Sequence, residues 1–132
     1  MILDEQALFS NNQAVTTSTA STNIINLGKR EISFGTPVEL FIQVSEAFNN
    51  LTDLTIKIQT AEEEAFSSPV SLAEQTIALE GLKQGAVSSL RYLPTGNLGY
   101  MRLYYEVNGT TPTTGKILAG IVYSPEQSHH NK

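Results

Sequence analysis

The fold class of this chain is decided by one stretch near its C-terminus, Gly99-Tyr-Met-Arg-Leu-Tyr-Tyr-Glu-Val-Asn-Gly-Thr-Thr-Pro-Thr-Thr-Gly-Lys-Ile-Leu-Ala-Gly-Ile-Val-Tyr123. Its first half alternates with a period of two residues, which is typical of a β-strand. One face carries Met101, Leu103, Tyr105 and Val107, and the other carries Tyr100, Arg102, Tyr104 and Glu106. The second half, Lys116 to Tyr123, is apolar on both faces, as expected of a strand buried in a sandwich. Asn, Gly and Pro in the loop between them favour a turn, so the stretch predicts a β-hairpin.

Further strands are predicted upstream by the same alternation. Leu40, Ile42 and Val44 follow Val38 on one face of the stretch 37–44. Between residues 54 and 60, Leu54, Ile56 and Ile58 are expected to point inward, while Thr55, Lys57 and Gln59 point outward. Extended segments are also expected over 22–27, 70–79 and 86–93. About seven or eight short strands separated by turns predict an all-β fold, an antiparallel β-sandwich that is jelly-roll-like.

Length and composition set the class of protein. A chain of 132 residues suggests one domain, residues 1–132, that buries a core without staples, and there is no cysteine. The net charge is −5 and the eight basic residues are scattered, which argues against a nucleic-acid partner. No stretch reaches the roughly 20 apolar residues of a membrane helix, and the N-terminus lacks the pattern of a signal peptide, so no membrane partner is expected.

The two ends of the chain are expected to differ from the body. Residues 1–21 form a possible N-terminal arm with the apolar residues Ile2, Leu3, Leu8 and Phe9, either a helical turn or an extended segment. The arm either docks on the body or reaches a neighbouring subunit. The Ser/Thr-rich tract before Asn23 is either an edge strand or part of that arm. Residues 124–132 are a flexible polar tail.

Residues that carry chemistry are sparse. The two histidines, His129 and His130, lie in the polar tail, and no nucleophile motif or positioned base is present. The three glutamates at 62–64 lack the spacing of a cation loop and predict a solvated turn. Phe66 behind them is expected to plug the edge of the sandwich. We therefore expect no enzyme, no catalytic or cofactor-binding residues, no metal site and no cofactor.

Tyrosine side chains are the remaining candidates for a binding surface. Tyr92, Tyr100 and Tyr104 are predicted close to basic side chains such as Arg102. Such side chains are enriched at protein interfaces, they stack on sugars, and they also half-bury at the rim of a sheet. All three interpretations stay open from the sequence.

Several stretches together resemble one family. They are the opening Met1-Ile-Leu-Asp4, the tract Ala14-Val-Thr-Thr-Ser-Thr-Ala-Ser-Thr-Asn-Ile-Ile-Asn-Leu-Gly28, the segment Ala65-Phe-Ser-Ser-Pro-Val-Ser-Leu-Ala73, and Gly99 to Gly109 with the return Thr-Gly-Lys-Ile-Leu-Ala-Gly120. With these, the chain is similar to the small β-sandwich proteins that are encoded beside the major capsid protein in tailed bacteriophages. Those proteins are capsid-stabilising proteins, also called cement or decoration proteins.

The resemblance implies a structural virion protein without a cofactor or a reaction. The protein would be made in the bacterial host cytoplasm and sit on the outer surface of an icosahedral capsid. There it would clamp adjacent copies of the major capsid protein, as a homo-oligomer (a dimer or trimer) near local symmetry axes. The alternative is a carbohydrate-binding or receptor-binding module, and a hydrolase comes last. The candidate capsid or subunit contacts come from the residues themselves: Ile2, Leu3, Leu8, Phe9, Tyr92, Tyr100, Arg102 and Tyr104.

Overall fold

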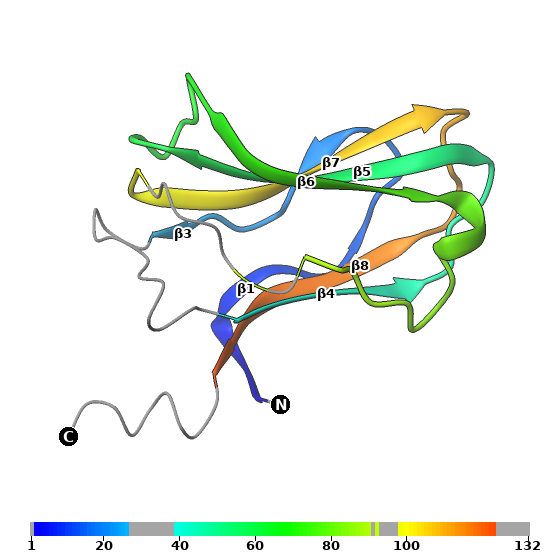
Figure 1. The fold of residues 1–132 in the computed structure, drawn as a ribbon, viewed down its shortest axis with the longest axis horizontal. Helices are drawn as coiled ribbons and strands as arrows, with labels where there is room; N and C mark the ends of the chain where they lie inside the picture. Colours follow the sequence, from blue (N-terminus) through cyan, green and yellow to red (C-terminus); the bar gives the residue numbers. More distant parts are fainter. Residues whose placement is uncertain (1, 27–38, 91, 93–97, 124–132) are drawn as a thin grey trace.

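Two antiparallel β-sheets face each other in the computed structural model, which describes residues 2–26, 39–90, 92 and 98–123, without the side chains of 2–7, 122 and 123 (Figure 1). The small sheet has the strand order β1 (Ile2–Ala14), β8 (Lys116–Tyr123) and β4 (Glu39–Glu46). The large sheet has the order β2 (Thr19–Ala20), β7 (Tyr100–Gly109), β5 (Leu51–Ala61) and β6 (Val70–Ala78). β3 (Ile25–Asn26) also pairs with β7, and a short 3₁₀ helix (Leu79–Gly81) follows β6. The predicted antiparallel β-sandwich is confirmed.

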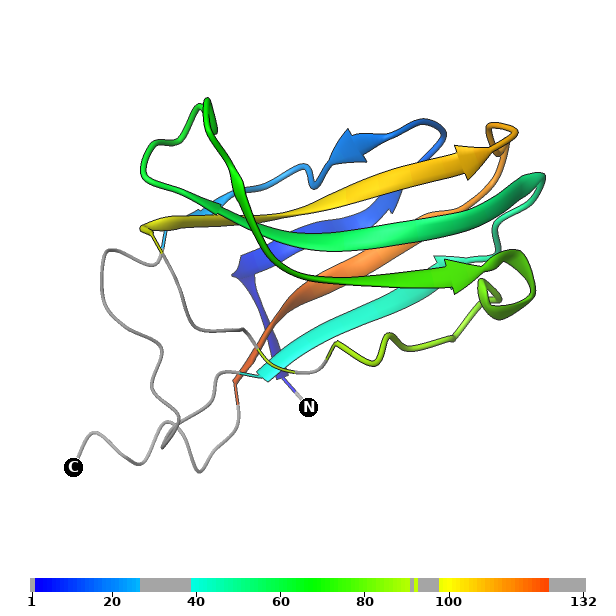
Figure 2. The ribbon, with the colours of Figure 1, turned by 45° about the horizontal axis from the view of Figure 1, so that its top comes forward.

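The pairing of the strands is nested. β1 pairs with β8, β2 and β3 pair with β7, and β5 pairs with β6. Between these, β4 is bridged to the segment that precedes β7, at Gln43 with Val87 and at Glu39 with Tyr92. Strands near one end of the chain therefore pair with strands near the other end, and strands in the middle pair with each other. This nested pairing over two sheets is that of a jelly roll. Figure 2 shows the strands of both layers lying along roughly the same axis, while paired neighbours run in opposite directions.

The hairpin predicted from the C-terminal stretch is wrong, although both of its strands form. β7 lies in the large sheet and β8 in the small sheet, so the loop between them crosses from one layer to the other. Both strands have an apolar inner face, which lets them meet across the core as well as side by side. Asn49 secures the crossing, because its Oδ1 accepts hydrogen bonds from the N–H groups of Thr113 (2.8 Å) and Thr114 (3.2 Å).

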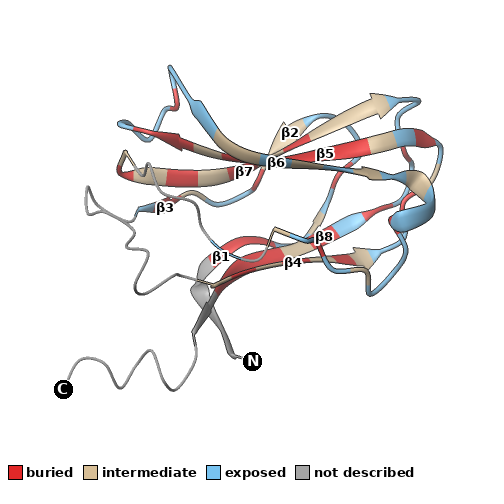
Figure 3. Ribbon diagram, viewed as in Figure 1, coloured by how far each residue is buried: buried red, intermediate tan, exposed pale blue. Residues whose placement is uncertain are grey.

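The core lies between the two sheets, where Figure 3 shows the buried residues of the facing strands. The predicted inward residues of β4, β5 and β7 are all buried there except Val107, which is partly buried against it. From β1 and β8 of the small sheet, Phe9, Ile117 and Ala119 join the cluster with no exposed surface, and Ile121 joins it with 5% exposed. Burial of this continuous apolar layer is the main force that holds the sheets together.

The segment predicted as a strand at 86–93 is not a regular strand over its described part. It runs beside β4 and makes single ladder bonds, such as Ser88 N–H to the Ile42 carbonyl (2.9 Å). Side-chain bonds replace the rest of the ladder: the Ser89 N–H donates to Gln75 Oε1 of β6 (3.1 Å) and the Leu90 N–H to Ser88 Oγ (3.0 Å). Serine side chains compete with the backbone ladder in this way.

The first residues of the chain do not form a free arm. β1 covers Ile2–Ala14 and is an edge strand of the small sheet, paired along β8 with three register shifts. The tract that follows crosses to the large sheet, where Thr19 and Ala20 pair with β7, so the edge-strand alternative holds there. The apolar residues of β1 therefore belong to a strand of the small sheet. The expectation of an arm rested on their having no such strand.

Some predictions fall outside the described residues. They concern Met1, Leu27, the turn at 28–30, Val38, Arg91, most of the turn at 94–99, and the polar tail 124–132 with both histidines.

Candidate functional site

The outer face of the large sheet gathers the polar and aromatic side chains of its central strands. We define the tyrosine face as a set of six residues from three segments. They are Tyr100, Arg102 and Tyr104 of β7, Lys57 and Gln59 of β5, and Phe66 from the loop between β5 and β6. Met101, Leu103 and Tyr105 occupy the core side of β7, so the residues between them must point outward. The register places Lys57 beside Tyr104 and Gln59 beside Arg102, on the same side of the sheet.

Arg102 is the most constrained side chain of the tyrosine face. Its Nε donates to Gln59 Oε1 (2.9 Å), and its guanidinium carbon lies 4.3 Å from the centre of the Phe66 ring. The same carbon lies 5.8 Å from the centre of the Tyr104 ring, so aromatic rings contact the cation from two residues. Partial burial lowers the pKa of the guanidinium, but an arginine remains charged at neutral pH.

Phe66 was expected to plug the edge of the sandwich, and it has another role. It is buried, with 6% of its surface exposed, but it does not belong to the core cluster between the sheets. Its φ of +52° is unusual for a bulky residue and costs free energy. The glutamates at 62–64 before it are exposed, as the prediction of a solvated turn requires.

Lys57 is the second cation of the tyrosine face and is already neutralised. Its Nζ lies 3.0 Å from Glu106 Oε1 on the neighbouring strand. The hydrogen bond and charge of Glu106 raise the pKa of Lys57, and Glu74 on β6 adds to this. Both side chains are substantially exposed, so the pair contributes little to stability.

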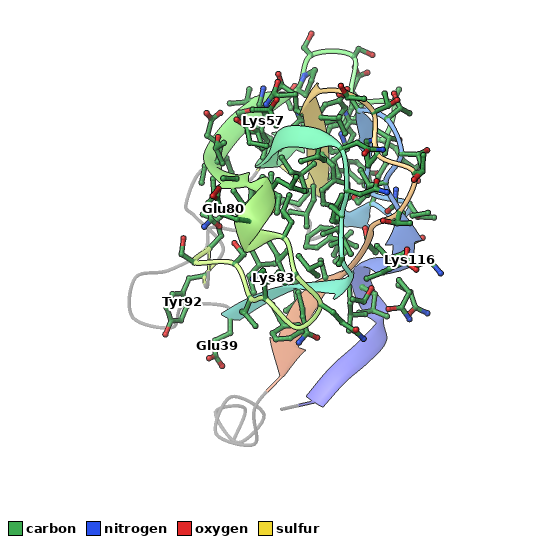
Figure 4. All side chains as sticks on the ribbon, turned by 90° about the vertical axis from the view of Figure 1, so that its right-hand side faces the viewer. Glu39, Lys57, Glu80, Lys83, Tyr92 and Lys116 are labelled. Carbon is green, nitrogen blue, oxygen red and sulfur yellow. The ribbon has the colours of Figure 1, made fainter. Side chains whose placement is uncertain are left out.

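The predicted contact residues separate into four groups. Tyr100, Arg102 and Tyr104 meet on the tyrosine face. Tyr92 is 54% exposed but lies beside Glu39 of the small sheet, apart from Lys57 (Figure 4). Leu8 and Phe9 are buried, with 7% and 0% of their surfaces exposed, so they are not available to a partner in this fold.

Ile2 and Leu3 form the fourth group. Their backbones pair with Tyr123 and Val122 at the end of β8. They therefore lie at the border of the small sheet, away from the strands that carry the tyrosine face. The assignment of these two residues as contacts stays a prediction.

The outward side of the small sheet is apolar as well, but Leu8 and Gly120 on it are buried. Leu8, Gly120 and Phe41 form one row across β1, β8 and β4, with Leu118 one step along β8. Their neighbours in sequence belong to the core cluster, whereas these four residues do not. Phe41 and Leu118 are half-buried. The prediction that β8 is apolar on both faces is therefore correct, and only its inner face is covered by the other sheet.

Sequence reasoning missed the partners that hold Arg102. Alternation along 54–60 placed Gln59 on an outer face, but only the register of β5 against β7 brings it to Arg102. Phe66 arrives from a loop whose positive φ has no sequence signature. Among the described residues, no group of three or more His, Cys, Asp or Glu side chains is arranged to hold a metal ion. None of the helices in the described part is long and apolar enough to cross a membrane.

Comparison with models of protein families gives a match over most of the chain. The model of the Bbp16 family matches residues 9–121. No curated protein matches it. The chain therefore belongs to the Bbp16 family.

Proposed function

We propose that this member of the Bbp16 family is a structural virion protein. In this proposal it binds the outside of a tailed-phage icosahedral head and clamps adjacent subunits of the major capsid protein, which stabilises the shell. The observation that carries the proposal is the tyrosine face: a broad sheet surface on which Tyr100 and Tyr104 flank a held arginine. The resemblance of the sequence to capsid-stabilising proteins supports it, and the name of the Bbp16 family suggests a phage-related protein.

The composition of the face supports protein binding. Tyrosine and arginine are among the residues that contribute most to protein interfaces, because they offer large contact area together with a polar group. Here both tyrosine rings are half-buried, so the sheet limits their freedom before any partner arrives. Less side-chain entropy is then lost on binding.

Clamping a shell needs many modest contacts and no reaction. Copies placed around symmetry axes add their contacts by avidity, and a homo-oligomer, a dimer or trimer, would strengthen this. We therefore propose no cofactor, no catalytic residue and no nucleic-acid or membrane partner. The proposed location is the outer surface of the capsid.

Co-sedimentation with phage heads that lack the protein tests this proposal. We expect saturable binding at a fixed ratio to capsid subunits, and heads that survive a higher temperature once they are loaded. Light scattering of the free protein gives its oligomeric state in the same experiment. Failure to bind the heads of the phage that encodes it would contradict the proposal.

A carbohydrate-binding module is the second candidate, because aromatic rings beside an arginine also suit a sugar. The absence of tryptophan, the usual stacking platform, weighs against it. A glycan array separates the two candidates, since a capsid-binding protein should show no specific signal on it.

A further inference from the structure

Arg102 is a cation without a carboxylate among the residues that the structure describes. The one ion pair there joins Lys57 to Glu106, and the guanidinium makes a single hydrogen bond, from Nε to Gln59. An amide oxygen carries no net charge, so this bond leaves the positive charge of Arg102 uncompensated. In a chain of net charge −5, with 13 acidic residues, a half-buried arginine has been left without an internal partner.

The geometry around Arg102 favours a planar anion. Gln59 accepts the hydrogen bond from Nε, and the centre of the Phe66 ring lies 4.3 Å from the guanidinium carbon. These two contacts fix the side chain and leave both Nη groups without a hydrogen-bond partner among the described residues. The two Nη groups are parallel donors, and such a fork matches the two oxygens of a carboxylate.

Backbone strain at Phe66 supports a binding role. A phenylalanine at φ +52° is held there against its own preference, because the left-handed region suits glycine or asparagine. Strain of this kind tends to occur where the surrounding structure prepares a site. The ring that the strained residue supplies is the one that contacts Arg102.

The charges nearby select a singly charged ligand. Lys57 is neutralised by Glu106, and Glu74 faces it from β6. One free guanidinium beside these carboxylates balances one carboxylate but not a phosphate dianion. The open surface of a sheet also fits a protein better than a small acid, which needs a concave pocket.

We propose that Arg102 is a carboxylate-binding site, and that it takes the side chain of an aspartate or glutamate on the protein surface that the tyrosine face docks on. This inference rests on the proposed function, in which that surface belongs to the capsid. Arg102 forms a bidentate ion pair there, Phe66 and Gln59 position it, and the tyrosines around it exclude water from the pair.

The test compares four proteins on heads that lack this protein: the wild type, Arg102→Gln, Arg102→Lys and the control Lys83→Gln. Lys83 is exposed and lies in the loop after β6, away from Lys57 in Figure 4, so the control makes the same change of charge elsewhere. We expect Arg102→Gln to weaken binding by about tenfold or more, because a paired charge is lost. Arg102→Lys should recover only part of the affinity, since an ammonium lacks the planar fork. Lys83→Gln should bind as the wild type does.

A second arm identifies the ligand. Amidation of the surface carboxylates of the heads should weaken the wild type and leave the residual binding of Arg102→Gln nearly unchanged. If Arg102→Gln binds untreated heads as tightly as the wild type, the inference is overturned while the proposed function stands. If no version binds heads, the proposed function fails first. Binding to an acidic glycan that depends on Arg102 would overturn the assignment to a protein carboxylate.

Discussion

The hydroxyl of Tyr105 is a polar group in the middle of the core, and a chain of hydrogen bonds satisfies it. Tyr105 has no exposed surface, and its hydroxyl lies 2.6 Å from Ser10 Oγ of β1. Ser10 donates in turn to Gln13 Oε1 (2.6 Å), so Tyr105 is the donor to Ser10. Gln13 also binds the backbone at Ala20 and Thr22. These hydrogen bonds therefore tie both sheets to the crossing between them, and the Tyr105 and Ser10 hydroxyls are both paired.

Stability at high pH depends on this tyrosine. Burial raises the pKa of Tyr105 well above its usual range, whereas in the unfolded chain it ionises near pH 10. Above about pH 10 the folded protein therefore holds a proton that the unfolded chain has lost. The free energy of unfolding should fall as pH rises there, by up to about 1.4 kcal/mol per pH unit.

Urea unfolding between pH 8 and 11 measures this effect. Tyr105→Phe should remove the loss above pH 10, although it removes a hydrogen bond as well and lowers stability at every pH. Tyr92→Phe changes an exposed tyrosine and should keep the wild-type slope. Equal slopes for the wild type and Tyr105→Phe would show that the buried hydroxyl does not control this dependence.

Alanine substitution at two glycines with positive φ distinguishes the cost of backbone strain from the cost of a steric clash. Gly115 has φ +135°, and a Cβ added there would overlap the ring of Phe48. Gly85 has φ +92°, but a Cβ there would meet no atom within 4 Å. Gly85→Ala should cost about 1 kcal/mol of backbone strain, whereas Gly115→Ala should cost about 3 kcal/mol or more. Thermal unfolding of both variants checks this, and equal losses would contradict the packing of Phe48 on Gly115.

Among the secondary-structure elements, β1 is an integral strand of the sandwich and not a free arm. Phe9 of β1 belongs to the core cluster and is fully buried. Deleting residues 1–9, which at first suggests itself as a test of capsid contact, would instead remove core packing and one edge of the small sheet. Loss of binding by such a truncation would then report unfolding.

Substitution of one phenylalanine tests the place of β1. Phe9→Ala should lower the free energy of unfolding by about 3–5 kcal/mol, because it leaves a cavity in the core. Phe41→Ala makes the same chemical change on the outer face of the small sheet and should cost about 1 kcal/mol. Urea denaturation measures both variants. A small loss for Phe9→Ala would mean that β1 is weakly docked after all.

The segment 82–90 closes the sandwich between β4 and β6 through Gln75. The Oε1 atom of Gln75 accepts hydrogen bonds from Ser88 Oγ and from the Ser89 N–H. Gln75→Ala should therefore loosen the segment locally. Hydrogen exchange should speed up at the amides of Ser88, Ser89 and Leu90, while the amides of β5 keep their protection. Unchanged exchange at these three amides would show that other contacts hold the segment.

Much of the element pattern follows from the sequence. Alternation gives the inward faces of β4, β5 and β7, because a period of two is fixed by strand geometry. Alternation does not show which strands are neighbours in a sheet. For this reason β7 and β8 were expected to form a hairpin, although they lie in different layers. The apolar residues of β1 looked like an arm, because Ile2-Leu3 and Leu8-Phe9 are adjacent pairs with Asp4 and Glu5 between them and do not alternate. In the structure, β1 pairs with β8 through three register shifts.

At the scale of the whole molecule, the sandwich has two unlike outer surfaces. The large sheet presents the tyrosine face, which is polar and aromatic. The small sheet carries the apolar row of Leu8, Gly120 and Phe41, in which only Phe41 is partly exposed. Sequence alone places Tyr100, Arg102 and Tyr104 on one face. It does not show that Gln59 and Phe66 hold Arg102, because that depends on register and on one strained loop residue.

Electron cryo-microscopy of heads with and without the bound protein shows whether the protein binds the shell and through which of its sheets. We expect extra density on the outside of the shell, shaped as this sandwich. The large sheet should face a seam between capsid subunits, with Arg102 opposite an acidic side chain. Density that docks through the small sheet would contradict the assignment of the tyrosine face, and heads without any added density would contradict the proposed function itself.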